Sequence, residues 1–140
     1  MVLVDSSVWI EAARRDGDLA YKVGLEGLLY EDEAVWCGPI KLEVLGGAPP
    51  GQRALLTTMF GYVPHRSIED DSWEQAKECA WRLRDRGFTL PWNDVLIGSL
   101  ARQWGCRVYA KDSHFDIMRD ALGIRLYAPD YGGKFRADAG

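Results

Sequence analysis

The stretch MVLVDSSVWIEAARR, residues 1–15, decides the fold of this chain. Its apolar start ends abruptly on Asp5, and the residues that follow have helical spacing. This pattern predicts a buried strand over residues 2–4 and a helix over about residues 7–14. Asp5 is open to two interpretations here: it caps the helix, or the strand delivers its carboxylate to a site of chemistry.

The rest of the chain repeats this alternation of short apolar runs and amphipathic stretches. Further strands are predicted over residues 34–38, 106–110 and 124–128, with one over residues 62–66 that Pro64 interrupts. Helices are predicted over residues 18–30, 39–47, 52–60, 72–87, 91–104 and 113–123, the fourth opened by a capping box of Ser72 and Gln75. Strands separated by helices imply right-handed crossovers. We therefore expect an α/β fold, a three-layer domain with a central, mostly parallel β-sheet flanked by helices.

Composition indicates one soluble globular domain. The 140 residues are 47% hydrophobic and 27% charged. No apolar run approaches the ~18 residues of a membrane-spanning helix, and the first residues do not form a signal peptide. Cys37, Cys79 and Cys106 lack CxxC spacing and are predicted to be reduced, mostly buried thiols in a cytoplasmic protein. The net charge of −4 does not indicate a nucleic-acid binder, although bound divalent cations would reverse the local sign.

Four acids stand at conspicuous positions in the predicted fold. Asp5 and Asp112 follow two predicted strands, and ligands of parallel sheets bind outside the carboxyl ends of the strands. Glu43 and Asp94 lie in apolar helical segments, where an isolated ionised carboxylate is costly unless it is paired or bound to metal. Small residues beside them, such as Gly98, would leave room for a hydrated ion.

Each acid also has a purely structural interpretation. Asp112 could cap the helix that begins near residue 113, Asp94 suits the first turn of a helix, and Glu43 could point to solvent. Asp116 follows Ser113 at capping-box spacing, so a structural role and a metal-site role both stay open for it.

Other conspicuous residues are not assigned to a functional site. His65 and His114 lack a partner set that would predict a metal site or a nucleophilic triad. The six tryptophans are interpreted as core or interface residues rather than base-stacking platforms.

A cluster of carboxylates without a cysteine or histidine set suits Mg²⁺ or Mn²⁺ and not zinc. Such a cluster could instead hold two ions about 3.5–4 Å apart, one activating water and one stabilising the leaving oxygen, which is the chemistry of phosphodiester hydrolysis. The chain has no Walker-type loop and no GxGxxG motif. NTP-dependent and dinucleotide chemistry are therefore disfavoured.

Four motifs carry the acids: VDSSVWIE (residues 4–11), KLEVLGG (residues 41–47), LPWNDVLIGSLA (residues 90–101) and KDSHFDIM (residues 111–118). In this order and spacing they resemble the acidic motifs of PIN-domain ribonucleases, and more closely those of VapC-type toxins of prokaryotic toxin–antitoxin pairs. The resemblance runs from about residue 2 to residue 126, and NDVLIGSLA departs slightly from the more usual xDxLIAAxA. We expect a PIN-like nuclease domain over residues 1–130 and a C-terminal tail over residues 131–140.

The resemblance implies a cytoplasmic, Mg²⁺- or Mn²⁺-dependent endoribonuclease that is the toxin of a type II pair and leaves a 5′-phosphate. RNA is the implied substrate, and an antitoxin protein and a second copy of the chain are the implied partners. The family makes Asp5, Glu43, Asp94 and Asp112 the catalytic and metal-binding quartet, and Asp116 falls where some members have an additional acid. We expect the three aspartates of the quartet to hold one ion, and Glu43 to hold a second ion or to act as general base.

Three further residues are candidates for the substrate side of the site. Ser6 or Ser7 matches a small hydroxyl residue of the family that binds the phosphate or a water on the metal. Lys111 is a phosphate-contact candidate because it stands beside Asp112 in the fourth motif.

Other functions stay open. A PIN-type nuclease that works in RNA processing or on DNA would carry the same acids. A catalytically inactive interaction module of the same fold has no reason to group four carboxylates. A response-regulator-like phospho-acceptor domain also uses acids at strand ends, but it offers no comparable role for Glu43 or Asp94.

Overall fold

The computed structural model describes residues 1–129, so the predicted tail over residues 131–140 and the boundary before it lie outside the described residues. The strands of the described part are β1 (Val2–Val4), β2 (Ala34–Val35), β3 (Arg107–Tyr109) and β4 (Arg125–Leu126). The helices are α1 (Ser6–Ala13), α2 (Leu19–Tyr30), α3 (Gly38–Gly46), α4 (Pro50–Tyr62), α5 (Ser72–Asp85), α6 (Trp92–Trp104) and α7 (His114–Leu122). The strands form one sheet in the order β2-β1-β3-β4, and each pairing is parallel.

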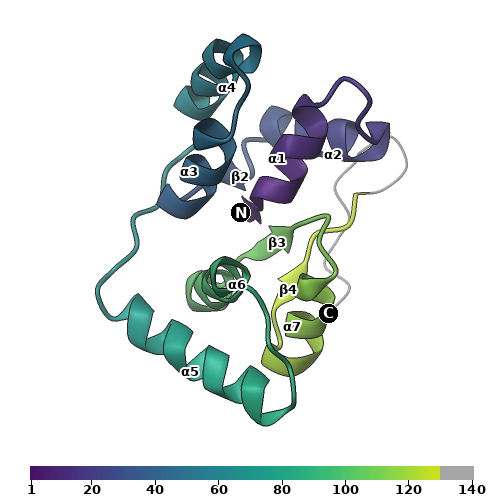
Figure 1. Ribbon diagram of the computed structural model, residues 1–140. Helices are drawn as coiled ribbons and strands as arrows, with labels where there is room; N and C mark the ends of the chain where they lie inside the picture. The colour runs from purple at the N-terminus through teal and green to yellow at the C-terminus, as the bar shows by residue number, and fades with distance from the viewer. Residues whose placement is uncertain (130–140) are drawn as a thin grey trace.

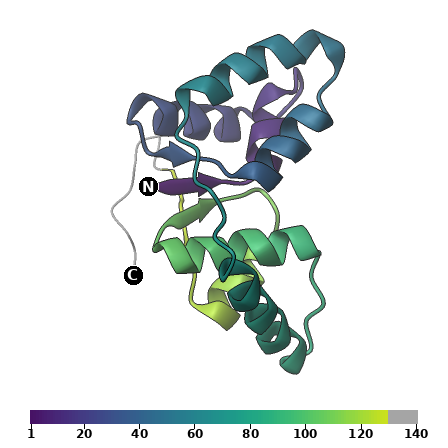
Figure 2. The same ribbon diagram turned by 90° about the vertical axis from the view of Figure 1, so that its left-hand side faces the viewer.

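The elements are stacked in three layers. Helices α1 to α4 lie on one side of the sheet and α5 to α7 on the other, as both ribbon views show (Figure 1 and Figure 2). Helix packing follows the same division, because α1 packs on α2 and α3, whereas α5, α6 and α7 pack on one another. The predicted three-layer α/β fold is confirmed.

The first strand is central, which explains its composition. β1 lies between β2 and β3, and Val2, Leu3 and Val4 have no exposed surface. A strand buried on both faces needs an unbroken apolar run, so the sequence does not alternate there. Trp9 of α1 is also fully buried and stacks on Phe60 of α4 with 4.5 Å between ring centroids, which joins two helices of one layer.

Two local predictions are wrong. The capping box expected at Ser72 does not form, because the residue is buried as the first residue of α5 and no side chain caps the helix after Asp71. The interrupted strand over residues 62–66 is also absent, since α4 continues through Tyr62 and leaves only an isolated bridge between Trp36 and His65.

The predicted burial of Cys37, Cys79 and Cys106 is confirmed, and all three are free in the structure. Among residues 1–129, none of the helices has the length and apolar composition needed to span a bilayer.

Candidate active site

Asp5 stands at the carboxyl end of β1, where its backbone N–H donates to the Tyr109 carbonyl of β3 at 2.9 Å. Its carboxylate is buried and caps α1, because Oδ2 accepts a hydrogen bond from the Ser7 N–H at 3.1 Å. The two interpretations of Asp5 are therefore compatible. One carboxylate caps a helix and stands at the edge of the sheet where ligands of parallel α/β folds bind.

Two serines hold the predicted catalytic acids in place. The Ser7 hydroxyl donates to Asp5 Oδ2 at 2.6 Å and accepts from the Lys111 N–H at 3.0 Å, so it ties the end of β1 to the segment after β3. The Ser6 hydroxyl donates to Glu43 Oε2 at 2.8 Å and ties α1 to α3. Both hydroxyls thus orient acids of the predicted quartet.

Glu43 reaches the site from α3 but is not buried as the sequence suggested. It is exposed, and the preceding Leu42 is 74% exposed, so the expected cost of a carboxylate in apolar surroundings does not arise. Glu43 nevertheless acts on Asp5. Burial is the main cause that raises the pKa of the Asp5 carboxyl, and the negative charge of Glu43 raises it further. Glu43 therefore lies at the solvent-exposed edge of the site.

Asp94 of α6 and Asp112, which follows β3, converge on His114 at the start of α7. His114 Nδ1 lies 2.7 Å from Asp94 Oδ2 and 2.9 Å from Asp112 Oδ1. One donor atom from each of the three residues lies within 4.8 Å of the others, a grouping that could hold a metal ion. The interpretation of His114 as a residue without partners is wrong, because packing of α6 on α7 brings it to Asp94. Its position two residues after Asp112 was the signal in the sequence.

The capping interpretation of Asp112 also holds in part. Its Oδ1 accepts a hydrogen bond from the His114 N–H at 3.0 Å, at the start of α7. Like Asp5, Asp112 uses one carboxylate both to accept a hydrogen bond at the start of a helix and to form part of the acidic cluster.

Burial, with neighbouring negative charge as a smaller cause, raises the pKa values of Asp5 and Asp94. Burial is the main cause that raises the pKa of Asp94 to about 6, and the charges of Asp5 and Asp112 add to it, while the hydrogen bond with His114 acts the other way. That hydrogen bond is the main cause that raises the pKa of His114. Because Asp5 and Asp112 both act on Asp94, the three acids form one electrostatic unit. A divalent cation would relieve their repulsion, so the donor set fits a metal.

Gly98 positions this cluster instead of leaving room for a hydrated ion. A Cβ built on Gly98 would lie 2.5 Å from Met118 Sδ, so the glycine allows α6 to approach α7 closely. Gly98 follows Asp94 by four residues and Met118 follows His114 by four residues, and residues at this spacing share a helix face. The close contact therefore holds Asp94 and His114 against each other.

Lys111 is engaged by a partner within the chain. Its Nζ lies 3.0 Å from Glu11 Oε2, and the Glu11 carboxylate also accepts from the Asp18 N–H at 2.7 Å. The hydrogen bond from Asp18 is the main cause that lowers the pKa of Glu11. Lys111, the predicted phosphate contact, is therefore held in an ion pair with Glu11.

Asp116 is exposed and pairs with Arg119 at 3.6 Å. It is not among the three residues of the metal-competent group. The capping box expected with Ser113 does not form, because the Ser113 side chain makes no capping hydrogen bond.

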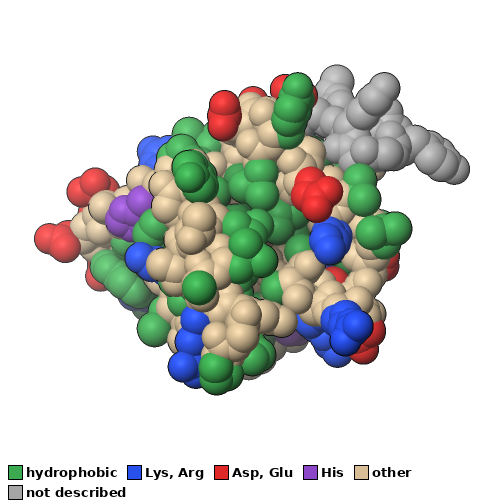
Figure 3. Space-filling view, turned by 90° about the horizontal axis from the view of Figure 1, so that it is seen from above, with side chains coloured by type: hydrophobic (Ala, Val, Ile, Leu, Met, Phe, Trp, Pro, Cys, Tyr) green, Lys and Arg blue, Asp and Glu red, His purple; other side chains and the backbone are tan. Residues whose placement is uncertain are grey.

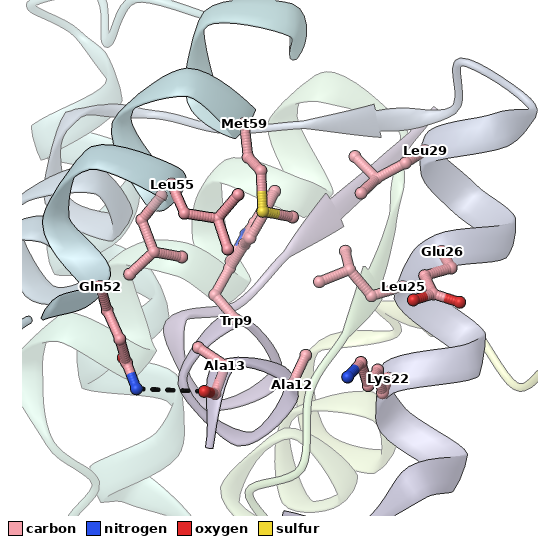
Figure 4. Close-up of a pocket in the computed structure, with 11 residues that line it drawn as sticks. Trp9, Ala12, Ala13, Lys22, Leu25, Glu26, Leu29, Gln52, Leu55 and Met59 are labelled. Atoms are coloured by element: carbon pink, nitrogen blue, oxygen red, sulfur yellow. Dashed lines mark hydrogen bonds between the residues drawn. The ribbon is translucent and has the colours of Figure 1, made fainter. Parts of the chain in front are cut away.

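A separate pocket of about 250 Å³ lies between α1, α2 and α4. Figure 4 shows Trp9, Leu55 and Met59 around it and the Gln52 amide donating to the Ala13 carbonyl at 3.1 Å. Seen from above, hydrophobic side chains gather toward the middle of the molecule and most charged ones toward its rim (Figure 3). The four predicted catalytic acids do not line this pocket, so it offers apolar contact rather than acid–base chemistry.

Comparison with known proteins gives relatives for most of the chain. No protein-family model matches it. VapC ribonuclease Mb1587 of Mycobacterium bovis and Ribonuclease VapC11 of Mycobacterium tuberculosis are each 32% identical to it over 123 residues, which cover 84% of this chain and 91% of the relative.

Solved structures share the fold. VapBC2 from Rickettsia felis bound to a DNA fragment from its promoter gives a TM-score of 0.72 at 15% identity, covering 84% of this chain and 93% of the other. A toxin–antitoxin complex from Klebsiella pneumoniae gives a TM-score of 0.64 at 18% identity, covering 81% and 88%.

Proposed function

The chain belongs to the VapC ribonuclease family, and we propose that it is a metal-dependent endoribonuclease, the toxin of a type II toxin–antitoxin pair. The relatives confirm the family that the four acidic motifs resemble. A structure with the same fold is a toxin–antitoxin complex, which supports an antitoxin protein as a partner of this chain. The three free thiols support a cytoplasmic location.

The observation that carries this function is the grouping of Asp94, Asp112 and His114 within 4.8 Å, beside the end of the sheet where Asp5 stands. We assign one Mg²⁺ or Mn²⁺ ion to the three aspartates. Carboxylate oxygens suit both ions. When bound, the ion supplies Lewis-acid stabilisation of the negative charge that develops on the phosphate.

Glu43 is assigned as the general base. Solvent reaches its carboxylate, and the Ser6 hydroxyl holds Oε2, so Oε1 can take a proton from the attacking water. The water oxygen bonds to phosphorus in line with the departing 3′ oxygen, and the bond from phosphorus to that oxygen breaks. The products are a 5′-phosphate and, after the 3′ oxygen takes a proton from solvent, a 3′-hydroxyl. A role for Glu43 as ligand of a second ion is the alternative within this site.

The remaining predicted residues are assigned to the border of the site. Ser6 and Ser7 orient Glu43 and Asp5. Lys111 adds a positive charge next to Asp112 for the phosphate. Asp116 is a ligand only if a second ion binds outside the main cluster.

The pocket between α1, α2 and α4 is assigned to the antitoxin. Its lining is mostly apolar, which suits a polypeptide segment better than RNA. Trp9 and Ala12 of α1 border the pocket, and the same helix begins at Ser6 beside the acids. A segment seated in the pocket can therefore continue along α1 toward the acidic site. The family supports a second copy of the chain as a further partner.

Cleavage of a mixed RNA panel by the purified protein, freed of any antitoxin, tests this function. Cleavage is expected with Mg²⁺ or Mn²⁺, none with EDTA, and none by Asp5→Ala or Asp94→Asn. Asp120→Asn is the matched control, because Asp120 is an exposed acid of α7 that pairs with Arg119 away from the cluster. A folded protein that cuts no RNA under any of these conditions would instead be an interaction module of the same fold.

A further inference from the structure

Helices α5 and α6 pack side by side (Figure 1). The pocket between them is bordered by exposed tryptophans. Trp73, Trp81 and Trp92 are 56%, 58% and 69% exposed, although tryptophan is usually well buried. The pocket measures about 360 Å³, and Val95 of α6 forms part of its lining. Three indoles left in water on one surface indicate a contact that lies outside the chain.

The charged residues of this pocket are both cations. Lys77 Nζ lies 4.6 Å from the ring centroid of Trp81, and Arg84 Cζ lies 5.8 Å from that of Trp92. Lys77 also pairs with Glu74, outside the pocket lining. A chain with a net charge of −4 thus places positive charge beside its exposed indoles. Aromatic faces interleaved with cations match a flexible polyanion that carries planar rings.

This surface and the acidic site lie on different faces of α6 at the same end of the helix. Trp92 is the first residue of α6 and Asp94 lies within the same first turn. The helix presents Trp92 and Val95 to the pocket, whereas Asp94 faces His114. From Trp73 to Arg84 the axis of α5 runs roughly 16 Å at about 1.5 Å per residue, enough for several stacked bases at about 3.4 Å each.

We propose that this tryptophan groove, formed by Trp73, Trp81 and Trp92 with Lys77 and Arg84, binds a single-stranded segment of the RNA substrate next to the cleaved bond. Bases stack on the indoles, the two cations face the phosphates, and Trp92 leads the strand to Asp94. The proposal rests on the proposed function and names the surface that holds its substrate.

A binding measurement in EDTA tests the groove without requiring cleavage. The probe is a fluorescein-labelled, unstructured 12-nucleotide RNA, followed by fluorescence anisotropy. Trp73→Leu/Trp81→Leu is expected to weaken binding roughly fivefold or more for each indole. Tyr30→Leu and Tyr62→Leu are the matched controls, since each tyrosine is 85% exposed on a helix of the other layer, and they should bind as the unaltered protein does.

A second variant keeps the result interpretable if the indole replacements impair folding. Lys77→Gln/Arg84→Gln should lower the affinity. It should also make the slope of log affinity against log salt less steep, by the amount that corresponds to the loss of about two phosphate contacts. Binding that is unchanged in both variants, or no RNA binding by the unaltered protein, overturns the proposal. So does a loss of binding that coincides with conversion of a dimer to a monomer in light scattering, because the groove is then the surface for a second copy.

The failure of this proposal and that of the proposed function are distinguishable. Hydrolysis of a small phosphodiester such as bis-p-nitrophenyl phosphate in Mn²⁺ reports on the acids alone. The groove variants should retain that hydrolysis while losing RNA binding. A protein that binds RNA through the groove but hydrolyses neither substrate would refute the proposed nuclease activity and support the proposed RNA binding by the groove.

Discussion

His114 stands between two acids, with Nδ1 2.7 Å from Asp94 Oδ2 and 2.9 Å from Asp112 Oδ1. A positive imidazolium at this position balances the Asp94 carboxylate, which burial leaves poorly solvated and which the charges of Asp5 and Asp112 repel. A divalent cation would balance the same charges. Protons and metal therefore compete for one set of groups, and affinity for the metal should rise with pH.

The metal-free protein should become less stable as pH rises from 5 to 8. The folded pKa of Asp94 is about 6 against an ordinary 3.8, and that of His114 is raised above 6.5, so the folded state retains protons that the unfolded chain has released. Retained protons favour the folded state at lower pH, and this advantage is lost as pH passes through the folded pKa values. Thermal unfolding in EDTA measures the trend, which Asp94→Asn should reduce; a melting temperature that rises over this range in the unaltered protein contradicts it.

Replacing the proposed base should remove catalysis and leave the fold intact. Glu43→Gln is expected to lower kcat by about 10²–10⁴-fold, because the neutral amide cannot take a proton from water. Its exposed position predicts an unchanged melting temperature. The exposed Glu31→Gln control should keep the kcat of the unaltered protein. An unaltered kcat in Glu43→Gln would assign the proton transfer elsewhere.

Ser7→Ala should destabilise the protein by about 1–3 kcal/mol, because the buried Asp5 carboxylate and the Lys111 N–H each lose a hydrogen-bond partner. Ser113→Ala is the matched control, since that exposed serine makes no capping hydrogen bond. Its expected effect lies within about 0.5 kcal/mol. Urea unfolding of both variants at pH 7.5 measures the difference, and equal stabilities would remove the role given to Ser7.

Gly24→Ala should cost about 1–3 kcal/mol by overpacking. A Cβ on Gly24 would lie 2.2 Å from the hydroxyl and 2.9 Å from the ring of Tyr109, whose buried aromatic ring has little room to move. Gly51→Ala on α4 meets nothing within 4 Å and should be neutral or slightly stabilising. Parallel urea titrations compare the two; a neutral Gly24→Ala would show that Tyr109 can shift.

Much of the acidic site was predictable from the sequence because strand ends are visible in it. The apolar runs before Asp5 and Asp112 mark buried strands, and parallel strands bring their carboxyl ends to the same edge of a sheet. The spacing of residues predicted neither the strand order β2-β1-β3-β4 nor that β1 and β3 are neighbours. That pairing is a long-range contact, and it decides how close the two acids come.

The errors share a physical origin in tertiary packing. His114 gains its acidic partners from the contact of α6 with α7, and Gly98 serves that contact rather than an ion. Glu43 stands in an apolar run, yet Leu42 beside it also faces solvent, so the run did not report burial. Neither Ser72 nor Ser113 makes the capping hydrogen bond that its spacing in the sequence predicted.

Calorimetric titration of Mn²⁺ into the metal-free protein at pH 7.5 tests the central claim most directly, that Asp5, Asp94 and Asp112 form one divalent-cation site. The unaltered protein and Asp120→Asn should bind the ion with equal affinity, and Asp94→Asn should bind it at least about tenfold more weakly. Equal Mn²⁺ affinity in Asp94→Asn and Asp120→Asn, or no binding by the folded unaltered protein, would contradict the site described here.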